Sequence, residues 1–378
     1  MQLGTALWAV KGASAPEVER AHARAIDLMI AGGPVAEDFP ALFGLCLLNT
    51  VRGNFDRSTR LVEQMKELAS QGDEAMRLQS LHSSWAYALL SGRIDEAVAT
   101  ADEGLSIYRP EAHHALSFQY GNHDPGVCAL TFRAVAAALR GESLRAVAQL
   151  REAIDLSETL GHPISRVHPL SWLPVVLYIN GDVDGVVLES ERALAATGEL
   201  VYPMLSGIVR AMRVWALSCR ARYEEGIAEL EGALADQLNM ANNVFAVLIG
   251  TVLADVHLRL GRREAARAVL DDARALTDSM RTYFYEPELL RVEAESFRLE
   301  GSEADARRLF LRAIETAREH GSWALAVRAA VQLVRTSEVE HEADLKLLVD
   351  LCDRLPPEND TDYRREAEVL LARTFTTT

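Results

Sequence analysis

Residues 261–301 read GRREAARAVLDDARALTDSMRTYFYEPELLRVEAESFRLEG, and this stretch holds one complete unit of the fold. It starts at a Gly-containing break, after which Ala266, Leu270 and Ala273 follow as small, large and small residues. These positions share one helical face because seven residues are close to two helical turns. A second segment, LLRVEAESFRL, has the i, i+3, i+4, i+7 spacing of a helix and ends at Gly301. The stretch therefore predicts two packed helices joined by a turn.

The same unit recurs along the chain. Breaks rich in Gly and charge separate the apolar segments at intervals of 39, 49, 40, 40, 40 and 40 residues: RGNFDRS at Gly53, SGRIDEA at Gly92, RGESLRA at Gly141, NGDVDGV at Gly181, RARYEEG at Ala221, LGRREAA at Gly261 and EGSEADA at Gly301. Extending the period reaches Ala13 and His341. Strand-like alternation does not persist anywhere in the sequence. We predict an all-α fold, a right-handed helical-hairpin solenoid of about nine repeats of about 40 residues.

The repeat array is expected to occupy residues 1–357, with an insertion around 108–125 that lengthens one interval. Pro163 and Pro203 stand at the same phase of the repeat and predict helix starts, because a first-turn proline costs no hydrogen bond. The Pro-Pro break in DRLPPEND predicts that residues 358–378 form a capping helix and a tail.

Composition excludes several classes of protein. The 378 residues are 49% hydrophobic and 25% charged, as in a folded chain with a sizeable core. The net charge of −16 argues against nucleic acid, because a phosphate-binding surface needs a basic stripe. The four cysteines lie far apart, so neither a CxxC site nor a disulfide framework is expected. With no signal peptide and no long apolar segment, the sequence predicts a cytoplasmic protein without a membrane partner.

Three stretches carry a resemblance to a known family: FQYGNHDPGVCALTF at 118–132, ETLGHPIS at 158–165 and RYEEGIAELEGALA at 222–235. With the small, large, small second helices they resemble the C-terminal TPR-like repeat region of bacterial multidomain signalling ATPases, which also carry class III nucleotide cyclase or LuxR-type helix-turn-helix domains. The resemblance implies a sensing or docking module. Because GxxxxGK[ST] and a strand-linked GxGxxG are both absent, ATP hydrolysis is not carried over, and we predict no enzyme activity and no cofactor.

In TPR-like superhelices the first helix of each pair lines the concave side, at about 13, 10, 6, 3 and 2 residues before the turn. These offsets select candidate binding residues: His168, Ser171, Tyr178, Trp215, Thr251, Asp255, Arg259, Arg291 and Glu295, together with Cys128, Thr131, Ser218, Glu288 and Arg298. The aromatic and small polar groups suit a peptide or a small molecule. In the alternative interpretation, Tyr178 and Trp215 complete the packing between repeats.

The insertion, RPEAHHALSFQYGNHDPG, is the second place where function is expected. His113, His114, His123 and Asp124 could offer metal ligands, but their spacing matches no known motif, and we predict no metal site. A structural interpretation has Asp124, followed by Pro125, capping the next helix. The third interpretation is a ligand pocket with Tyr120, His123, Asp124, His168 and Tyr178.

The predicted function is non-catalytic: a scaffold or sensor that binds a protein or peptide in its concave groove during bacterial signalling or regulation. In the alternative, the solenoid has a pocket near the 108–125 insertion. That pocket binds a small-molecule effector or has become the active site of an enzyme. A weaker alternative is a scaffold that forms homo-oligomers. It rests on the N-terminal segment, where Leu3, Leu7, Trp8 and Val10 lack an upstream partner, which also suggests a fragment of a longer protein.

Overall fold

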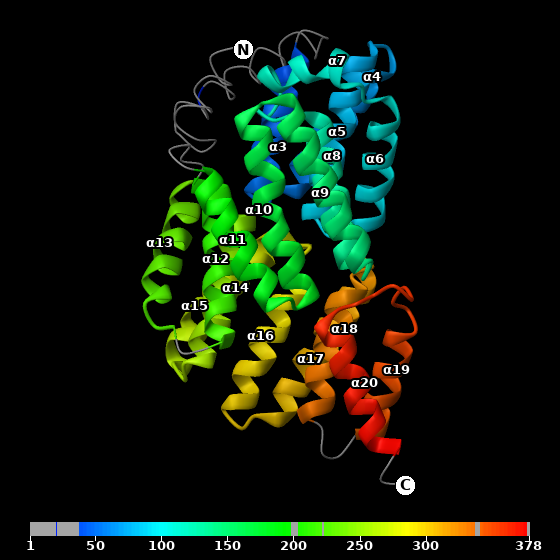
Figure 1. The fold of residues 1–378 in the computed structure, drawn as a ribbon. Coiled ribbons are helices and arrows are strands. Elements are labelled where there is room, and N and C mark those ends of the chain that lie inside the picture. The colour runs from blue at the N-terminus through cyan, green and yellow to red at the C-terminus, as the bar shows by residue number, and fades with distance from the viewer. Residues whose placement is uncertain (1–19, 21–37, 198–202, 221–222, 337–340, 376–378) are drawn as a thin grey trace.

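Figure 1 shows the computed structural model, which describes residues 20, 38–197, 203–220, 223–336 and 341–375. Its helices follow one another in pairs: α3 (Phe39–Val51) and α4 (Phe55–Ser70), α5 (Glu74–Leu90) and α6 (Ile94–Ile107), α8 (Pro125–Leu139) and α9 (Ser143–Leu160), α10 (Pro163–Asn180) and α11 (Val183–Thr197), α12 (Pro203–Arg220) and α13 (Gly226–Asn239), α14 (Asn243–Arg259) and α15 (Arg263–Met280), α16 (Glu286–Leu299) and α17 (Glu303–His320), and α18 (Trp323–Thr336) and α19 (His341–Cys352). The short helices α7 (Pro110–His113) and η2 (His114–Phe118) form the insertion, and α20 (Asp362–Phe375) follows the last pair. The described ranges contain no β-strand, so the all-α prediction is confirmed.

The turns lie where the sequence period places them. Gly53, Gly92, Gly141, Gly181, Gly261 and Gly301 all have positive φ. At Gly141 a Cβ would also lie 2.6 Å from Leu355 Cδ2, so any larger residue there would displace that side chain. Helices α10 and α12 begin at Pro163 and Pro203, as predicted. The proposed turns at Ala13 and Ala221 and the N-terminal segment with Leu3 and Trp8 lie outside the described residues.

The small, large, small pattern packs the second helix of a pair against the first. In α9, Ala146, Leu150 and Ala153 are fully buried. Small residues at both ends of this face allow close approach of the helices, and the leucine between them fills the space. The second helices keep an exposed polar face, whereas α8, α10 and α14 are buried along almost their whole length. The first helices therefore form an inner layer, covered by the second helices.

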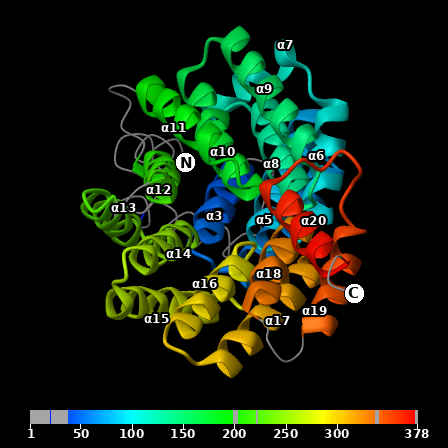
Figure 2. The same ribbon diagram turned by 60° about the horizontal axis from the view of Figure 1, so that its bottom comes forward.

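The superhelix turns far enough for its later repeats to lie against its earlier ones (Figures 1 and 2). Helix α14 contacts α3, and α18 contacts α8 and α10. The Phe284 backbone N–H donates to Leu90 O at 3.2 Å, and Asn359 Nδ2 donates to Gly141 O at 2.6 Å. These contacts join the end of α5 and the turn between α8 and α9 to segments about 200 residues later in the chain.

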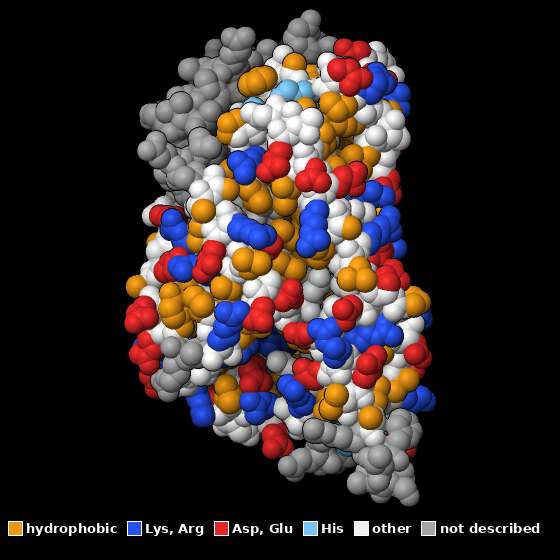
Figure 3. All heavy atoms as spheres, in the orientation of Figure 1, with side chains coloured by type: hydrophobic (Ala, Val, Ile, Leu, Met, Phe, Trp, Pro, Cys, Tyr) orange, Lys and Arg blue, Asp and Glu red, His pale blue; other side chains and the backbone are white. Residues whose placement is uncertain are grey.

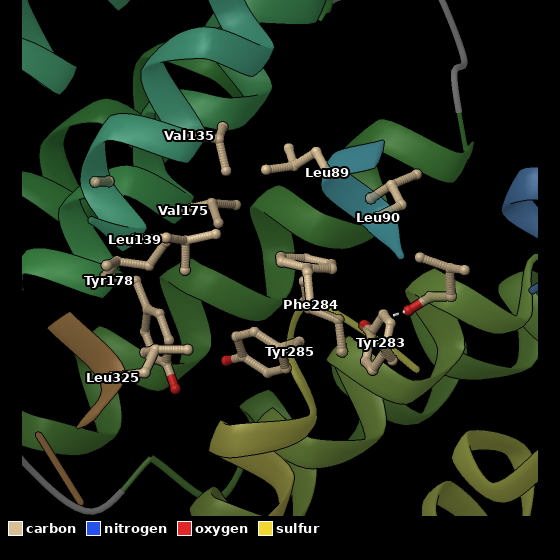
Figure 4. Close-up of a cluster of buried hydrophobic side chains, with 14 of the residues drawn as sticks. Leu89, Leu90, Val135, Leu139, Val175, Tyr178, Tyr283, Phe284, Tyr285 and Leu325 are labelled. Atoms are coloured by element: carbon tan, nitrogen blue, oxygen red, sulfur yellow. Dashed lines mark hydrogen bonds between the residues drawn. The ribbon is translucent and has the colours of Figure 1, made fainter. Parts of the chain in front are cut away.

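Figure 4 shows the apolar centre of this contact. Tyr283, Phe284 and Tyr285 precede α16 and are fully buried against Leu89 and Leu90 of α5 and against side chains of α8, α10 and α18. The interior of the solenoid is thus filled with side chains at this level. As a result, much of the inner layer that the sequence predicted to line a concave groove is covered.

The chain ends on a helix packed against the last repeat. Helix α20 contacts α18 and α19 and follows the segment with Pro356 and Pro357. The division of the chain at residue 357 stays a prediction. None of the helices in the described ranges has the length and apolar character needed to cross a membrane.

Candidate functional site

The inner layer contains two separate polar sites. The first, named here the arginine–carboxylate cluster, consists of Asp255 and Arg259 on α14, Glu288 and Arg291 on α16, and Arg328 on α18. Arg291 Nη2 lies 2.7 Å from Glu288 Oε1 and 3.5 Å from Asp255 Oδ1. Arg328 Nη2 lies 3.4 Å from Glu288 Oε1. Three guanidinium groups thus surround two carboxylates, with an excess of one positive charge.

Aromatic side chains from the neighbouring repeats complete this cluster. Tyr178 Oη donates to Glu288 Oε1 at 2.6 Å, and Trp215 Nε1 donates to Asp255 Oδ2 at 3.1 Å. The Arg328 guanidinium lies 4.5 Å from the ring centroid of Tyr178, within cation–π range. Tyr178 and Trp215 are almost fully buried. They therefore complete the packing between repeats, which is the alternative interpretation that the sequence left open.

The charges of the cluster keep one another ionised. Burial by itself raises the pKa of the Asp255 carboxyl, but Arg259, Arg291 and Arg328 outweigh burial and hold that pKa well below its usual range. Glu288 also has a lowered pKa, because Arg291 and Arg328 overcome the effect of burial. Both carboxylates are anions at neutral pH, and the buried arginines depend on them.

The outer edge of the cluster reaches solvent. The side chain of Arg259 is 38% exposed and donates through Nε to Asp255 Oδ2 at 3.1 Å. Glu295 pairs with Arg298 at 2.6 Å on the next first helix. Arg335 of α18 pairs with Glu366 of α20. The accessible border of the inner layer is therefore lined by ion pairs, and Figure 3 shows a hollow over α16 and α18 with charged side chains around it.

The second site, named here the histidine cluster, consists of His82 on α5, His123 in the insertion, Cys128 on α8 and His168 on α10. His82 Nε2 lies 3.1 Å from His123 Nε2. The rings of His123 and His168 stack with centroids 4.8 Å apart and planes 8° from parallel. One ligand atom each from His82, His123 and Cys128 lies within 4.8 Å of the other two.

A largely apolar cavity of about 100 Å³ lies beside the histidine cluster. Its lining comes from α3, α5, the insertion, α8, α10, α12 and α14, and includes all four members of the cluster. Burial lowers the pKa of His82 and His168 well below the usual range, and repulsion from a protonated His123 would lower each pKa further. Burial also lowers the pKa of His123. The three imidazoles are therefore neutral at physiological pH.

The rest of the insertion has a structural role. Asp124 Oδ1 accepts hydrogen bonds from the backbone N–H groups of Gly126 (2.9 Å) and Val127 (3.1 Å), so it caps α8 as the structural interpretation predicted. Its other oxygen pairs with His114 Nδ1 at 2.9 Å. Tyr120 packs edge-on against Phe43, with ring centroids 5.3 Å apart.

Two predicted binding residues have their hydroxyls bonded within their own helices. Ser171 Oγ donates to Val167 O and Thr251 Oγ1 donates to Val247 O, both at 2.8 Å. Both side chains are buried. The residues of the ligand pocket predicted near the insertion do not all lie together. His123 and His168 belong to the histidine cluster, whereas Tyr178 belongs to the arginine–carboxylate cluster. His113 pairs with Glu74 at 3.4 Å and lies outside the histidine cluster.

Sequence reasoning missed His82 and Arg328, although the repeat contained the signal for both. His82 stands ten residues before Gly92, and Arg328 stands thirteen residues before His341. These are two of the offsets that selected the other inner-layer residues. Extending the offsets to the repeats that turn at Gly92 and at His341 finds both side chains.

Comparison with known proteins supports the fold. No protein-family model matches the chain. Over 343 residues it is 26% identical to an uncharacterised protein, R02095, of Rhizobium meliloti (strain 1021), and the match covers 86% of this chain but 32% of that protein. The chain thus spans about a third of the length of that relative.

Two solved structures share the architecture over 90% of this chain and 98% of their own. One is a Rap protein complexed with competence and sporulation factor, with a TM-score of 0.57 and 12% identity. The other is NprR in complex with its cognate peptide NprX, with a TM-score of 0.54 and 12% identity. Together with the paired helices, these matches establish that the chain has a TPR-like helical solenoid fold.

Proposed function

We propose that this chain is a non-catalytic regulatory module that binds a protein or peptide segment carrying acidic groups. The binding surface is the accessible border of the arginine–carboxylate cluster, on the inner layer of α14, α16 and α18. Support comes from the fold, because the similar NprR structure contains a peptide, and from the chemistry of this border. The same comparisons favour a peptide over the small-molecule alternative.

The observation that carries the proposal is a local excess of arginine in an acidic chain. The whole sequence has a net charge of −16. The inner layer from α14 to α18 nevertheless has an excess of one positive charge, because Arg259, Arg291, Arg298, Arg328 and Arg335 meet the carboxylates of Asp255, Glu288, Glu295 and Glu366. A positive region on a negative protein steers acidic ligands toward that region.

The guanidinium of Arg259 is suited to direct recognition. It bonds Asp255 through Nε, and a guanidinium has four further N–H donors that match a carboxylate. The ion pair of Arg298 with Glu295 is partly exposed, so an incoming carboxylate can compete for this arginine at little cost. The buried members of the cluster hold the first helices in place beneath the border.

We further propose that the module controls an attached signalling domain. The relative from Rhizobium meliloti is about three times as long as the matched region, which supports a multidomain context. The resemblance to repeat regions of bacterial signalling ATPases points the same way. A cytoplasmic location and self-association remain predictions of the sequence.

The test is a binding screen with immobilised short peptides that end in Asp or Glu, beside the same peptides with Asn or Gln and an amidated C-terminus. We expect the wild-type chain to select acidic peptides and to lose affinity as salt is raised. In the double variant Arg259→Glu, Arg298→Glu, affinity for the selected peptide should fall by at least about tenfold.

Arg308→Glu is the matched control. Arg308 lies on the outer helix α17 and pairs with Asp305 three residues earlier, as Arg298 pairs with Glu295. The Arg308→Glu variant should bind the selected peptide with the affinity of the wild-type chain. The proposal fails if no acidic peptide is selected, or if the double variant retains full affinity while its circular dichroism shows a folded chain.

A further inference from the structure

The two imidazoles at the centre of the histidine cluster meet through their Nε2 atoms, which suits a shared cation. His82 Nδ1 lies 2.9 Å from Gln79 Oε1, and His123 Nδ1 lies 2.7 Å from Gly121 O. Both oxygens are acceptors, so each Nδ1 carries the proton. In the neutral rings each Nε2 is then a lone pair, and the two lone pairs face each other across 3.1 Å. A cation between the two atoms, whether a proton or a metal ion, would be shared by both lone pairs.

A thiol completes the set of donor atoms. Cys128 is buried on α8, and its Sγ accepts a hydrogen bond from Trp85 Nε1 at 3.4 Å. An N–H donor directed at sulfur stabilises a thiolate more than a thiol. Each of the three donor side chains therefore has an outer partner that orients it: Gln79, the Gly121 carbonyl and Trp85. Such partners are characteristic of protein metal sites.

We propose that His82 Nε2, His123 Nε2 and Cys128 Sγ bind one thiophilic metal ion, Zn²⁺ or Cu⁺. Two imidazole and one thiolate ligand match the preferences of these ions. In a tetrahedral zinc site, nitrogen ligands about 2.0–2.1 Å from the metal stand about 3.3 Å apart, close to the observed 3.1 Å. Bringing Cys128 Sγ to bonding distance needs only a small shift, because the three atoms already lie within 4.8 Å of one another.

The local backbone is built to hold His123 in this place. Gly121 has a φ of 66°, and a Cβ at this residue would lie 3.0 Å from His123 Cε1. Glycine thus permits both the turn and the close approach of the ring. On its other face, His123 stacks against His168, which limits rotation of the imidazole. The insertion therefore acts to deliver one metal ligand to the two supplied by α5 and α8.

The site leaves one coordination position for an exogenous ligand. His82, His123 and Cys128 all line the cavity of about 100 Å³, whose other walls include Phe43, Phe132 and Trp172. Three protein ligands with an open fourth position are typical of zinc sites that bind water or a small molecule. A metal there would make the binding of a small donor molecule possible in an otherwise apolar space.

Metal binding at this site should release one proton. An ordinary thiol carries its proton at neutral pH, whereas the metal ligand is the thiolate. On binding, the S–H bond breaks, the sulfur–metal bond forms, and the proton passes to the buffer.

The first experiment uses the full wild-type chain, freed of metal with a chelator and kept reduced. It is titrated with Zn²⁺, with Co²⁺ as a spectroscopic substitute, and with Cu⁺ under anaerobic conditions. We expect one equivalent to bind, a sulfur-to-cobalt charge-transfer band, and the release of about one proton when calorimetry is compared between two buffers. The tighter of the Zn²⁺ and Cu⁺ affinities, each measured against a competing chelator, identifies the ion.

Variants then assign the ligands. Cys128→Ser, nearly isosteric, should abolish the charge-transfer band and weaken binding by more than about 100-fold, and Gln79→Leu should weaken it by about 10- to 100-fold through loss of ligand orientation. Cys46→Ser is the matched control, since Cys46 is equally buried but belongs to α3 and bonds Ser58 O. Binding that is absent in the folded wild type, or that survives unchanged in Cys128→Ser, overturns the proposal.

Discussion

The two sites of the inner layer use the same repeat position for opposite chemistry. Cys128, His168, Glu288 and Arg328 each stand thirteen residues before a turn residue of the repeat, on α8, α10, α16 and α18. The first two belong to a neutral cluster beside an apolar cavity, and the last two to a network of full charges. The solenoid thus provides equivalent inward positions, and each repeat fills them independently.

The energetic consequences differ between the two sites. In the arginine–carboxylate cluster each charge depends on the others, because removal of one partner leaves an uncompensated buried charge. In the histidine cluster the groups are neutral, and replacement of His168, whose Nδ1 has no hydrogen-bond partner among the described residues, by an apolar side chain of similar size costs little. Each of the following predictions tests this contrast.

The largest effect is expected from Glu288→Ala. This change removes the acceptor of Tyr178 Oη, Arg291 and Arg328. Arg328 loses the carboxylate it pairs with, and Arg291 keeps only the longer contact with Asp255. The free energy of unfolding should fall by about 3–5 kcal/mol in urea denaturation. Asp305→Ala, in the exposed pair with Arg308, is the control and should change it by less than about 1 kcal/mol. A loss below about 1 kcal/mol for Glu288→Ala would remove the contrast between the two sites.

A pH titration should show the opposite behaviour of the histidine cluster. His82 and His168 have lowered pKa values in the folded protein because they are buried. As pH falls through about 6.5, the unfolded chain binds protons on these imidazoles and the folded chain does not. Each therefore lowers the free energy of unfolding by about 1.4 kcal/mol per pH unit below that value.

The check is urea denaturation of the metal-free chain between pH 7.5 and 5.5. We expect a loss of about 3 kcal/mol from these two groups together. The carboxylates Asp255 and Glu288 do not contribute in this window, because their pKa values are lowered and they stay ionised. A free energy of unfolding that is constant across this range would show that the imidazoles are already protonated in the folded state.

A smaller effect is expected at the cap that holds the insertion. Asp124→Ala removes the acceptor of the Gly126 and Val127 N–H groups and the partner of His114. The melting temperature should fall by an amount that corresponds to a loss of about 1–2 kcal/mol in the free energy of unfolding. Asp124→Asn keeps a capping oxygen and should lose less than the alanine variant does. Equal losses in the two variants would show that the contact of the carboxylate with His114, rather than the cap, is the stabilising interaction.

The smallest effect is expected from His168→Phe. The ring is buried between His123 and Phe132, and its Nδ1 has no hydrogen-bond partner among the described residues. A phenyl ring of similar size should therefore change the free energy of unfolding by less than about 1.5 kcal/mol. Urea denaturation of the wild-type chain and of the His168→Phe variant at pH 7.5 measures this change in the free energy of unfolding. A loss as large as that of Glu288→Ala would mean that His168 has a polar partner essential to the fold.

Local sequence determined the repeat, its turns and its caps. The period of about 40 residues predicted helix pairs because helical faces repeat over short distances, and Gly53 and Gly141 lie in the predicted turns. The capping of α8 by Asp124 followed from the adjacent Pro125, since cap and proline act within one turn of the helix. The side chains that point inward were also predictable, because they keep a constant offset from the turn.

Tertiary structure decided which of those inward positions meet, and which reach solvent. His82 and His123 are 41 residues apart and join only because the insertion folds back onto α5. Phe284 reaches Leu90, and Asn359 reaches Gly141, only after a full superhelical turn. The pitch of that turn accumulates from small rotations between successive repeats, which no local pattern of residues specifies. The sequence therefore predicted an inner layer, while the superhelix determined that it contains two closed clusters and one accessible charged border.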